Sequence, residues 1–331
     1  MRRDRPMTEP AATRKPTRDG VLEAARTIAA ILPPTPLLPV EIRDTQCWAK
    51  AESLQPIGAF KIRGAWNRIS QLSKAERERG VVGVSSGNHA QGVAWAAKRL
   101  GIPATIVMPS DAPLVKIDGV RALGAEIVSY ERRNGDRDAI AQAICDETGA
   151  TLVHAFADPW VIEGQGSAGI EAAAQLAERG VEGPTRFIAP CGGGGLSAGL
   201  ALACPDAEIV PVEPIGWDVI GRSLAENLVL RASPDAPATI CDCLLAPGAR
   251  EINLAVLRGR AQPGLTVSDA EIRAAMRFAF SHLRLVVESG AAAGLAAALT
   301  GKVAVDRATV IMLTGGNVDA ARFAEVIARG N

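Results

Sequence analysis

Near the N-terminus, hydrophobic residues recur at helical spacing. They predict an amphipathic helix over roughly 20–32, formed by Val21, Leu22, Ala25, Ile28, Ala29 and Leu32. Pro33, Pro34 and Pro36 follow at once, and proline is poorly tolerated inside a helix. The pattern therefore predicts one helix that ends at the proline cluster.

Beyond this helix, short apolar runs alternate with Ala-rich stretches. The runs predict buried strands at Val81–Val84, Ala104–Met108, Ile127–Ser129, Arg186–Ala189, Ile209–Val212 and Val310–Leu313. The Ala-rich stretches predict helices over 90–100, 165–179 and 269–283. Alternating strands and helices favour an α/β fold with mostly parallel open sheets flanked by helices. In such sheets ligands bind at the carboxyl ends of the strands.

Composition narrows the class of protein. A chain of 331 residues is long enough for two domains. Lys and Arg together number 36, as do Asp and Glu, so no overall charge favours nucleic acid or an acidic membrane. No apolar run reaches the length of a membrane span. The six cysteines are scattered, which is typical of reduced thiols and a cytoplasmic location.

A run of four glycines, Gly192–Gly195, follows the predicted strand at Arg186–Ala189 and precedes a helix-like segment. Free backbone N–H groups and the positive end of a helix dipole suit a phosphate. No Gly-Lys-Ser/Thr follows, and the spacing of a dinucleotide fingerprint is absent. The loop therefore indicates phosphate binding without identifying which phosphate, and a flexible surface turn is the alternative.

Three further segments carry candidate chemistry. Lys61 lies between Phe60 and Ile62, and apolar surroundings lower the pKa of a lysine, which suits Schiff-base formation. A turn at Ser85–His89 opens a helix after a strand, a geometry that suits either a bound carboxylate or an ordinary helix cap. Thr314–Asn317 is a similar turn after the last predicted strand. Taken singly, each of these has a purely structural alternative.

Taken together, the order of these segments resembles the fold-type II pyridoxal phosphate enzymes. Gly58–Ala65, Ser85–His89, Gly192–Gly195 and Thr314–Asn317 carry the resemblance, which covers about 22–328 and also includes Glu288-Ser289-Gly290. It is most similar to the branch of serine/threonine dehydratases and serine racemases. The resemblance implies a tryptophan synthase beta-like fold. We expect a disordered tail over 1–20, a large cofactor domain from 21–54 and 158–331, and a small substrate domain over 55–157.

The resemblance also implies roles for individual residues. Lys61 would hold pyridoxal 5'-phosphate and act as catalytic base, with Ser86 on the opposite face. The cofactor would contact Phe60, Lys61, Asn88, Gly192, Gly193, Gly194, Gly195, Leu196, Glu288 and Thr314. The carboxylate of an amino-acid substrate would be held by Ser85, Ser86, Gly87, Asn88 and His89. A homodimer or homotetramer is expected.

The expected activity is a threonine/serine dehydratase that converts a 3-hydroxy amino acid to a 2-keto acid and ammonia. A serine racemase, a 3-hydroxyaspartate dehydratase and a dehydratase of an unusual hydroxy amino acid are the alternatives. A non-catalytic binding protein is disfavoured by the presence of Lys61. Arg137 either favours a second substrate carboxylate or is a solvated helix residue.

The resemblance further implies a divalent or monovalent cation. Glu213 matches its first ligand and Trp217 offers a carbonyl, but Val219 stands where an aspartate is expected and Asp218 lies one place early.

Overall fold

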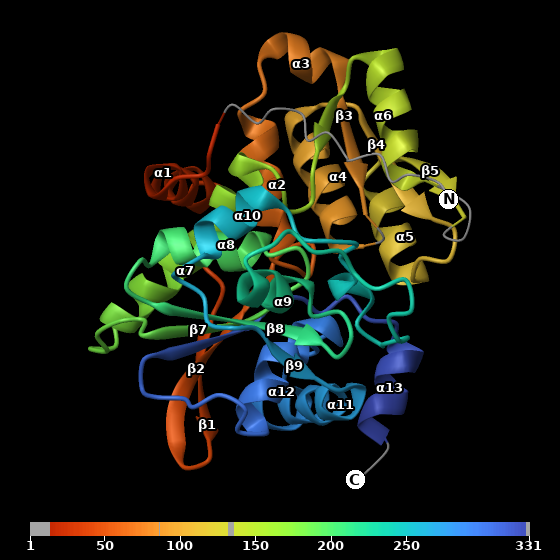
Figure 1. Ribbon diagram of the computed structural model, residues 1–331. Coiled ribbons are helices and arrows are strands. Elements are labelled where there is room, and N and C mark those ends of the chain that lie inside the picture. Colours follow the sequence, from red (N-terminus) through yellow and green to blue (C-terminus); the bar gives the residue numbers. More distant parts are fainter. Residues whose placement is uncertain (1–13, 86, 132–135, 329–331) are drawn as a thin grey trace.

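The computed structural model describes residues 14–85, 87–131 and 136–328 (Figure 1). Within these ranges, ten strands form two sheets. The larger sheet has the order β1 (Leu37–Ile42), β2 (Thr45–Ala51), β10 (Thr309–Leu313), β7 (Arg186–Pro190), β8 (Glu208–Pro214), β9 (Leu265–Val267). The smaller sheet has the order β5 (Glu126–Tyr130), β4 (Ala104–Pro109), β3 (Val81–Val84), β6 (Thr151–Val153).

The helices cover both faces of each sheet. The α-helices are α1 (Arg18–Ala29), α2 (Lys61–Ser70), α3 (Lys74–Arg79), α4 (Asn88–Leu100), α5 (Leu114–Ala122), α6 (Arg137–Thr148), α7 (Pro159–Ala177), α8 (Gly195–Ala203), α9 (Val219–Glu226), α10 (Glu251–Leu257), α11 (Asp269–Phe278), α12 (Ala293–Leu299) and α13 (Ala320–Ala328). Short 3-10 turns occur at η1 (Glu52–Leu54), η2 (Asp242–Leu244) and η4 (Gly290–Ala292), and a π-helical turn at η3 (Ala279–Leu283).

The expected α/β class with two mostly parallel sheets is confirmed. Only the β1–β2 hairpin is antiparallel among the described strand pairs. Helices α11 and α12 lie below the large sheet in Figure 1, whereas α7, α8 and α10 lie above it. The strands of the small sheet fall between residues 81 and 153. The exact domain limits stay a prediction.

Three sequence segments reach the same edge of the large sheet. Strands β2, β10 and β7 are neighbours and run parallel, so their carboxyl ends lie side by side. β2 leads through η1 into the segment before Lys61, β10 leads into Thr314, and β7 leads into Gly192. The strand order therefore brings together residues that are distant in the sequence.

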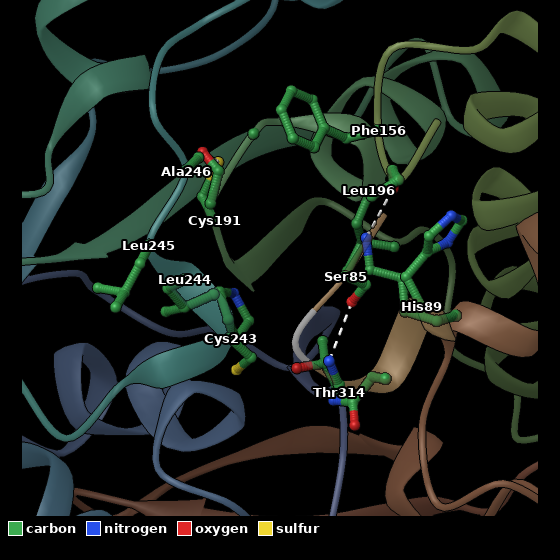
Figure 2. Close-up of a pocket in the computed structure, with 18 of the residues that line it drawn as sticks. Ser85, His89, Phe156, Cys191, Leu196, Cys243, Leu244, Leu245, Ala246 and Thr314 are labelled. Carbon is green, nitrogen blue, oxygen red and sulfur yellow. Dashed lines mark hydrogen bonds between the residues drawn. The ribbon is translucent and has the colours of Figure 1, made fainter. Parts of the chain in front are cut away.

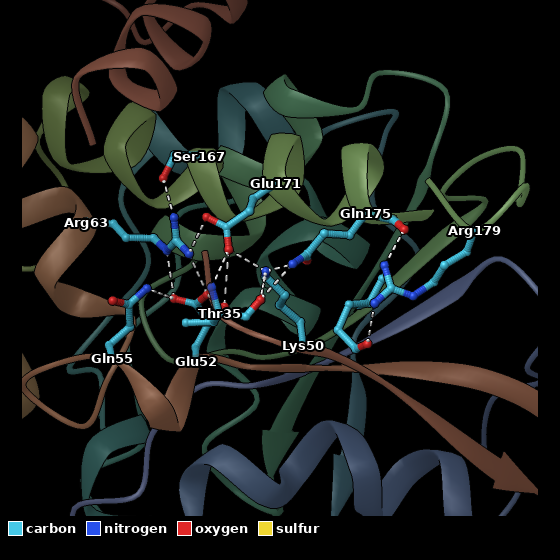
Figure 3. A network of polar contacts seen from close by, with 10 residues as sticks. Thr35, Lys50, Glu52, Gln55, Arg63, Ser167, Glu171, Gln175 and Arg179 are labelled. Carbon is cyan, nitrogen blue, oxygen red and sulfur yellow. Dashed lines mark hydrogen bonds and ion pairs between the residues drawn. The ribbon is translucent and has the colours of Figure 1, made fainter. Parts of the chain in front are cut away.

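A buried polar network holds α2, on which Lys61 lies (Figure 3). The guanidinium of Arg63 donates from Nε and Nη2 to the two oxygens of Glu52, at 2.7 Å each, and from Nη2 to Glu171 of α7 at 2.9 Å. Lys50 of β2 also pairs with Glu171, at 2.5 Å. Arg63 and Glu52 are buried, so each charge requires the other.

The N-terminal boundary and several helix limits differ from the prediction. Arg14 pairs with buried Glu163 at 2.9 Å, Thr17 caps α1, and α1 begins at Arg18. Residues 14–20 are therefore part of the folded chain rather than of a disordered tail. Helix α7 begins before the predicted start at 165, because Asp158 caps it and Pro159 occupies its first turn.

The predicted helix over 269–283 also changes character along its length. It is α-helical only to Phe278 and continues as the π-helical turn η3.

Replacing Arg63 tests the importance of this network for stability. Arg63→Met leaves the Glu52 carboxylate buried without its cation, so we expect the free energy of unfolding to fall by about 3–5 kcal/mol in urea titrations followed by circular dichroism. Arg26→Met is the matched control, because Arg26 forms an exposed ion pair with Glu23 and its loss costs less than about 1 kcal/mol. Equal losses in the two variants would contradict this account.

Candidate active site

One cavity collects most of the residues that the sequence predicted. Its lining includes Phe60, Lys61, Ser85, Gly87, Asn88, His89, Arg137, Gly192–Leu196 and Thr314. Figure 2 shows Ser85 and His89 across this cavity from Leu244 and Leu245. Glu288 and Glu213 do not belong to the lining. Ser86, the predicted residue on the face opposite Lys61, lies outside the described residues.

Backbone hydrogen bonds fix the position of Lys61. The N–H of Phe60 donates to the carbonyl of Thr314 at 3.0 Å, and the N–H of Gly316 donates to the carbonyl of Gly58 at 2.9 Å. Gly58 has a φ of +69°, and a Cβ there would lie 2.5 Å from the Asn317 side chain, so glycine is required. The turn after β10 and the segment before Lys61 thus form one small bridge.

The amine of Lys61 is enclosed. Its Nζ donates to the carbonyl of Ala155 at 2.8 Å and lies 5.2 Å from the centre of the Phe60 ring. Burial lowers the pKa of Lys61 to about 8, against a smaller opposing effect of Cys243 and Cys191. At pH 7 about a tenth of this amine is therefore neutral, far more than for an exposed lysine, and only the neutral amine acts as a nucleophile or general base.

The glycine loop has the shape of a phosphate cradle. Gly194 has a φ of +83° and immediately precedes α8, whose first N–H groups have no partner within the helix. A Cβ on Gly193 would lie 2.3 Å from the ring of Phe156, and one on Gly195 would lie 3.0 Å from the same side chain. Glycine thus keeps the backbone close to Phe156 while its N–H groups stay open to an anion.

The turn after β3 supplies backbone and side-chain donors opposite this loop. Gly87 donates to the hydroxyl of Ser85 at 3.0 Å, and α4 begins at Asn88. The side chain of Asn88 donates to Glu288 and accepts from Asn317 at 2.9 Å, which leaves one amide proton available to meet a ligand.

The ring of His89 has a structural role. Its Nε2 lies 2.8 Å from the carbonyl of Val153, and burial, together with the Lys61 charge, lowers the pKa of His89 to about 3. A neutral ring that donates to Val153 has only an accepting Nδ1 left, so it cannot donate to a carboxylate. The predicted contribution of His89 to carboxylate binding is therefore limited to its backbone N–H.

Glu213 is committed to a helix end. Its oxygens accept the N–H groups of Ile220 and Gly221 at 2.9 and 2.8 Å, at the start of α9. Val219 is buried, and Asp218 faces Arg222 at 3.6 Å. These residues do not assemble a set of cation ligands, so Glu213 as a metal ligand stays a prediction that this geometry does not support.

Sequence reasoning missed Lys116 and the segment 242–247, which also line the cavity. Lys116 pairs with Asp242 at 2.7 Å, across 126 positions of the chain. Neither residue stands in a recognisable motif, and only the fold brings them together. Leu244–Pro247 give this side of the cavity an apolar wall opposite the polar turn at Ser85.

Comparisons with known proteins agree with this geometry. The family model described as pyridoxal-phosphate dependent enzyme matches residues 28–315. The chain belongs to this family, is a pyridoxal-phosphate-dependent enzyme, and has the expected fold-type II architecture. Lys61, the glycine loop and Thr314 provide the amine, the anion cradle and the hydroxyl that suit this cofactor.

Individual relatives narrow the branch. The chain is 38% identical over 321 residues to an L-threo-3-hydroxyaspartate ammonia-lyase of Saccharomyces cerevisiae, covering 94% of this chain and 96% of the relative. It is 34% identical to a serine racemase of Schizosaccharomyces pombe, covering 95% and 98%. Among solved structures, maize serine racemase matches with a TM-score of 0.86 and 33% identity, covering 95% of this chain and 98% of that chain.

None of the described helices has the length and apolar character needed to cross a bilayer.

The lowered pKa of Lys61 predicts how covalent cofactor attachment depends on pH. Only the neutral amine attacks an aldehyde, so the rate at which cofactor-free protein binds pyridoxal phosphate covalently should rise about tenfold per pH unit below pH 8 and level off above it. Stopped-flow absorbance measures this rate. A small-molecule lysine analogue, as the control, should level off only near its ordinary pKa. If the rate measured with the protein also levels off only near the ordinary pKa of lysine, the burial of the Lys61 amine does not lower its pKa and the prediction is wrong.

Proposed function

We propose that this enzyme is an ammonia-lyase that converts a small 3-hydroxy amino acid to a 2-keto acid and ammonia. The observation that carries the proposal is the position of the Lys61 amine. It lies in one cavity with a phosphate cradle and with a turn of hydrogen-bond donors suited to a carboxylate. An amino acid held by its carboxylate at this turn presents its Cα region to Lys61.

Each residue of the cavity has a separate role in this proposal. Pyridoxal phosphate, when bound, withdraws electrons from the Cα of the substrate. Gly192–Leu196 would hold the phosphate, the hydroxyl of Thr314 would meet the pyridine nitrogen, and Asn88 would donate to the phenolic oxygen. Lys61 would remove the Cα proton, and the hydroxyl on the neighbouring carbon would leave as water. Thr314 offers a neutral hydroxyl rather than a carboxylate. The cofactor ring would then withdraw electrons less strongly, which favours elimination over a long-lived negative charge at Cα.

A second candidate is specific activity toward 3-hydroxyaspartate. Arg137, the first residue of α6, lines the cavity, and its pairing with the adjacent Asp138 is loose at 3.7 Å. A guanidinium at this position suits a second carboxylate on the substrate. Two relatives that are each 38% identical, the L-threo-3-hydroxyaspartate ammonia-lyases of Saccharomyces cerevisiae and Pseudomonas sp, support this candidate.

Racemisation of serine is a further alternative, beside dehydration of an unusual hydroxy amino acid. It requires a proton donor on the face opposite Lys61, and Ser86 is the residue predicted there. Serine racemases among the relatives support this possibility. The outcome is measurable, because a racemase changes the configuration of serine without releasing ammonia.

A substrate panel tests these proposals together. Holoenzyme is incubated with L-serine, D-serine, L-threonine and the 3-hydroxyaspartate diastereomers, and keto acid, ammonia and enantiomer ratio are all measured. We expect equal amounts of keto acid and ammonia from at least one of them. Arg137→Gln should lower kcat/KM for 3-hydroxyaspartate about 100-fold and change that for L-threonine less than about threefold, because only the former loses a charged contact.

Arg121→Gln is the matched control, since Arg121 is exposed on α5 and pairs with Asp118 at 3.5 Å. It should behave as the unaltered enzyme toward every substrate. Absence of keto acid from the whole panel would refute the lyase proposal. An equal loss with both substrates in Arg137→Gln would refute the specificity assigned to this residue.

A further inference from the structure

Lys116 is a buried lysine that lies between the small sheet and segments connected to the large sheet. It lies on α5, beside the small sheet, yet its Nζ donates to Asp242 at 2.7 Å and lies 3.1 Å from Glu288 Oε2. Both carboxylates lie in segments that connect strands of the large sheet, Asp242 between β8 and β9 and Glu288 between β9 and β10. Only 1% of Lys116 is exposed, so its charge is neutralised by these two partners rather than by water.

The stem of Lys116 also contacts the turn that follows β3. A Cβ placed on Gly87 would lie 2.6 Å from Lys116 Cδ, so the lysine stem passes directly beside the backbone of Gly87. One side chain therefore touches the carboxylate-binding turn of the small sheet and two acidic groups of the large domain. The position of the Lys116 side chain therefore depends on where the turn after β3 lies relative to Asp242 and Glu288.

A chain of contacts leads from Lys116 to the cofactor site. Glu288, paired with Lys116 through one oxygen, accepts the side-chain N–H of Asn88 with the other. Asn88 accepts in turn from Asn317, whose Nδ2 also donates to the carbonyl of Ile57 at 2.8 Å. These bonds set the orientation of the Asn88 amide, with nitrogen toward Glu288 and oxygen toward Asn317. Glu288 itself is outside the cavity lining and acts only through Asn88.

The charge of Glu288 decides whether this orientation holds. Burial raises the pKa of Glu288, and Lys116 opposes that effect. An ionised Glu288 is a pure acceptor and fixes the nitrogen of Asn88 toward itself. A neutral Glu288 carries a proton of its own, and the amide of Asn88 then has no single preferred orientation.

We propose that Lys116 is a positioning residue that keeps Glu288 an acceptor and thereby aims the remaining N–H of Asn88 at the cofactor. The inference rests on cofactor binding, and it goes beyond the proposed lyase activity because it holds for any amino-acid substrate. The Lys116–Asp242 pair adds a direct tie between α5 and η2 across the cavity.

The visible absorbance of the bound cofactor tests this directly, since it needs no substrate. Holoenzyme spectra are recorded at one pH for Lys116→Met, Lys116→Arg and Glu288→Gln. We expect the absorbance band to shift in Lys116→Met and Glu288→Gln in the same direction, and to return toward the original position in Lys116→Arg. With an accepted substrate, Lys116→Met should lower kcat about tenfold and change KM less than about threefold.

Lys98→Met is the matched control, because Lys98 is an exposed lysine that donates to the carbonyl of Ala122 at the end of α5. It should leave the spectrum unchanged. If Lys116→Met does not fold, Glu288→Gln and Asp242→Asn carry the test. Glu288→Gln must then shift the band, and Asp242→Asn, which keeps the Lys116–Glu288 pair, must not.

An unshifted band in Lys116→Met or Glu288→Gln would overturn the proposal. So would a rise in KM with unchanged kcat, which would assign Lys116 to packing against Gly87 alone. Absence of turnover with every substrate would refute the lyase proposal and leave the spectral result valid.

Discussion

The position of Lys61 depends on the buried charge of Arg63, two residues further along α2. The guanidinium joins Glu52, the first residue of η1 after β2, to Glu171 on α7, and so fixes the start of α2 against these two elements. Loss of one partner from a buried pair of this kind is strongly destabilising. The bridge between Phe60 and Thr314 adds a second anchor directly beside the reactive lysine. The Lys61 amine is thus held in place on both sides, as its proposed role as base requires.

Strand order explains why the cavity forms where it does. In the large sheet, β2, β10 and β7 deliver the Lys61 segment, Thr314 and the glycine loop to one edge. In the small sheet, β3 leads to Ser85 and its neighbour β6 leads to Ala155 and Phe156. Both sheets therefore point the carboxyl ends of their strands at the same space, which is the usual place for ligands in open α/β sheets. Lys116 then ties the two sides together through Asp242 and Glu288.

Much of this arrangement could be predicted from the sequence because local signals coincide with the fold. Buried strands such as Val81–Val84 are short apolar runs, and Gly192–Gly195 indicates an anion site without reference to any other segment. The hairpin of β1 and β2 was not predicted, since polar residues such as Gln46 and Lys50 break its apolar pattern. Charge pairs were not predictable either. Lys116 lies in ordinary helical sequence, and although Arg63 lies within Gly58–Ala65, no local signal shows that it pairs with Glu52 and Glu171. The motif places His89 at the substrate carboxylate, but it does not show that the ring Nε2 meets the carbonyl of Val153.

The covalent attachment of the cofactor to Lys61 is the central claim, and peptide mapping tests it most directly. Holoenzyme is reduced with borohydride, digested, and analysed by mass spectrometry. The account predicts a stable pyridoxyl group on the peptide that contains Lys61 and its absence from Lys61→Ala, which should still bind cofactor non-covalently. A pyridoxyl group on another lysine of the native holoenzyme, with Lys61 unmodified, would contradict the account.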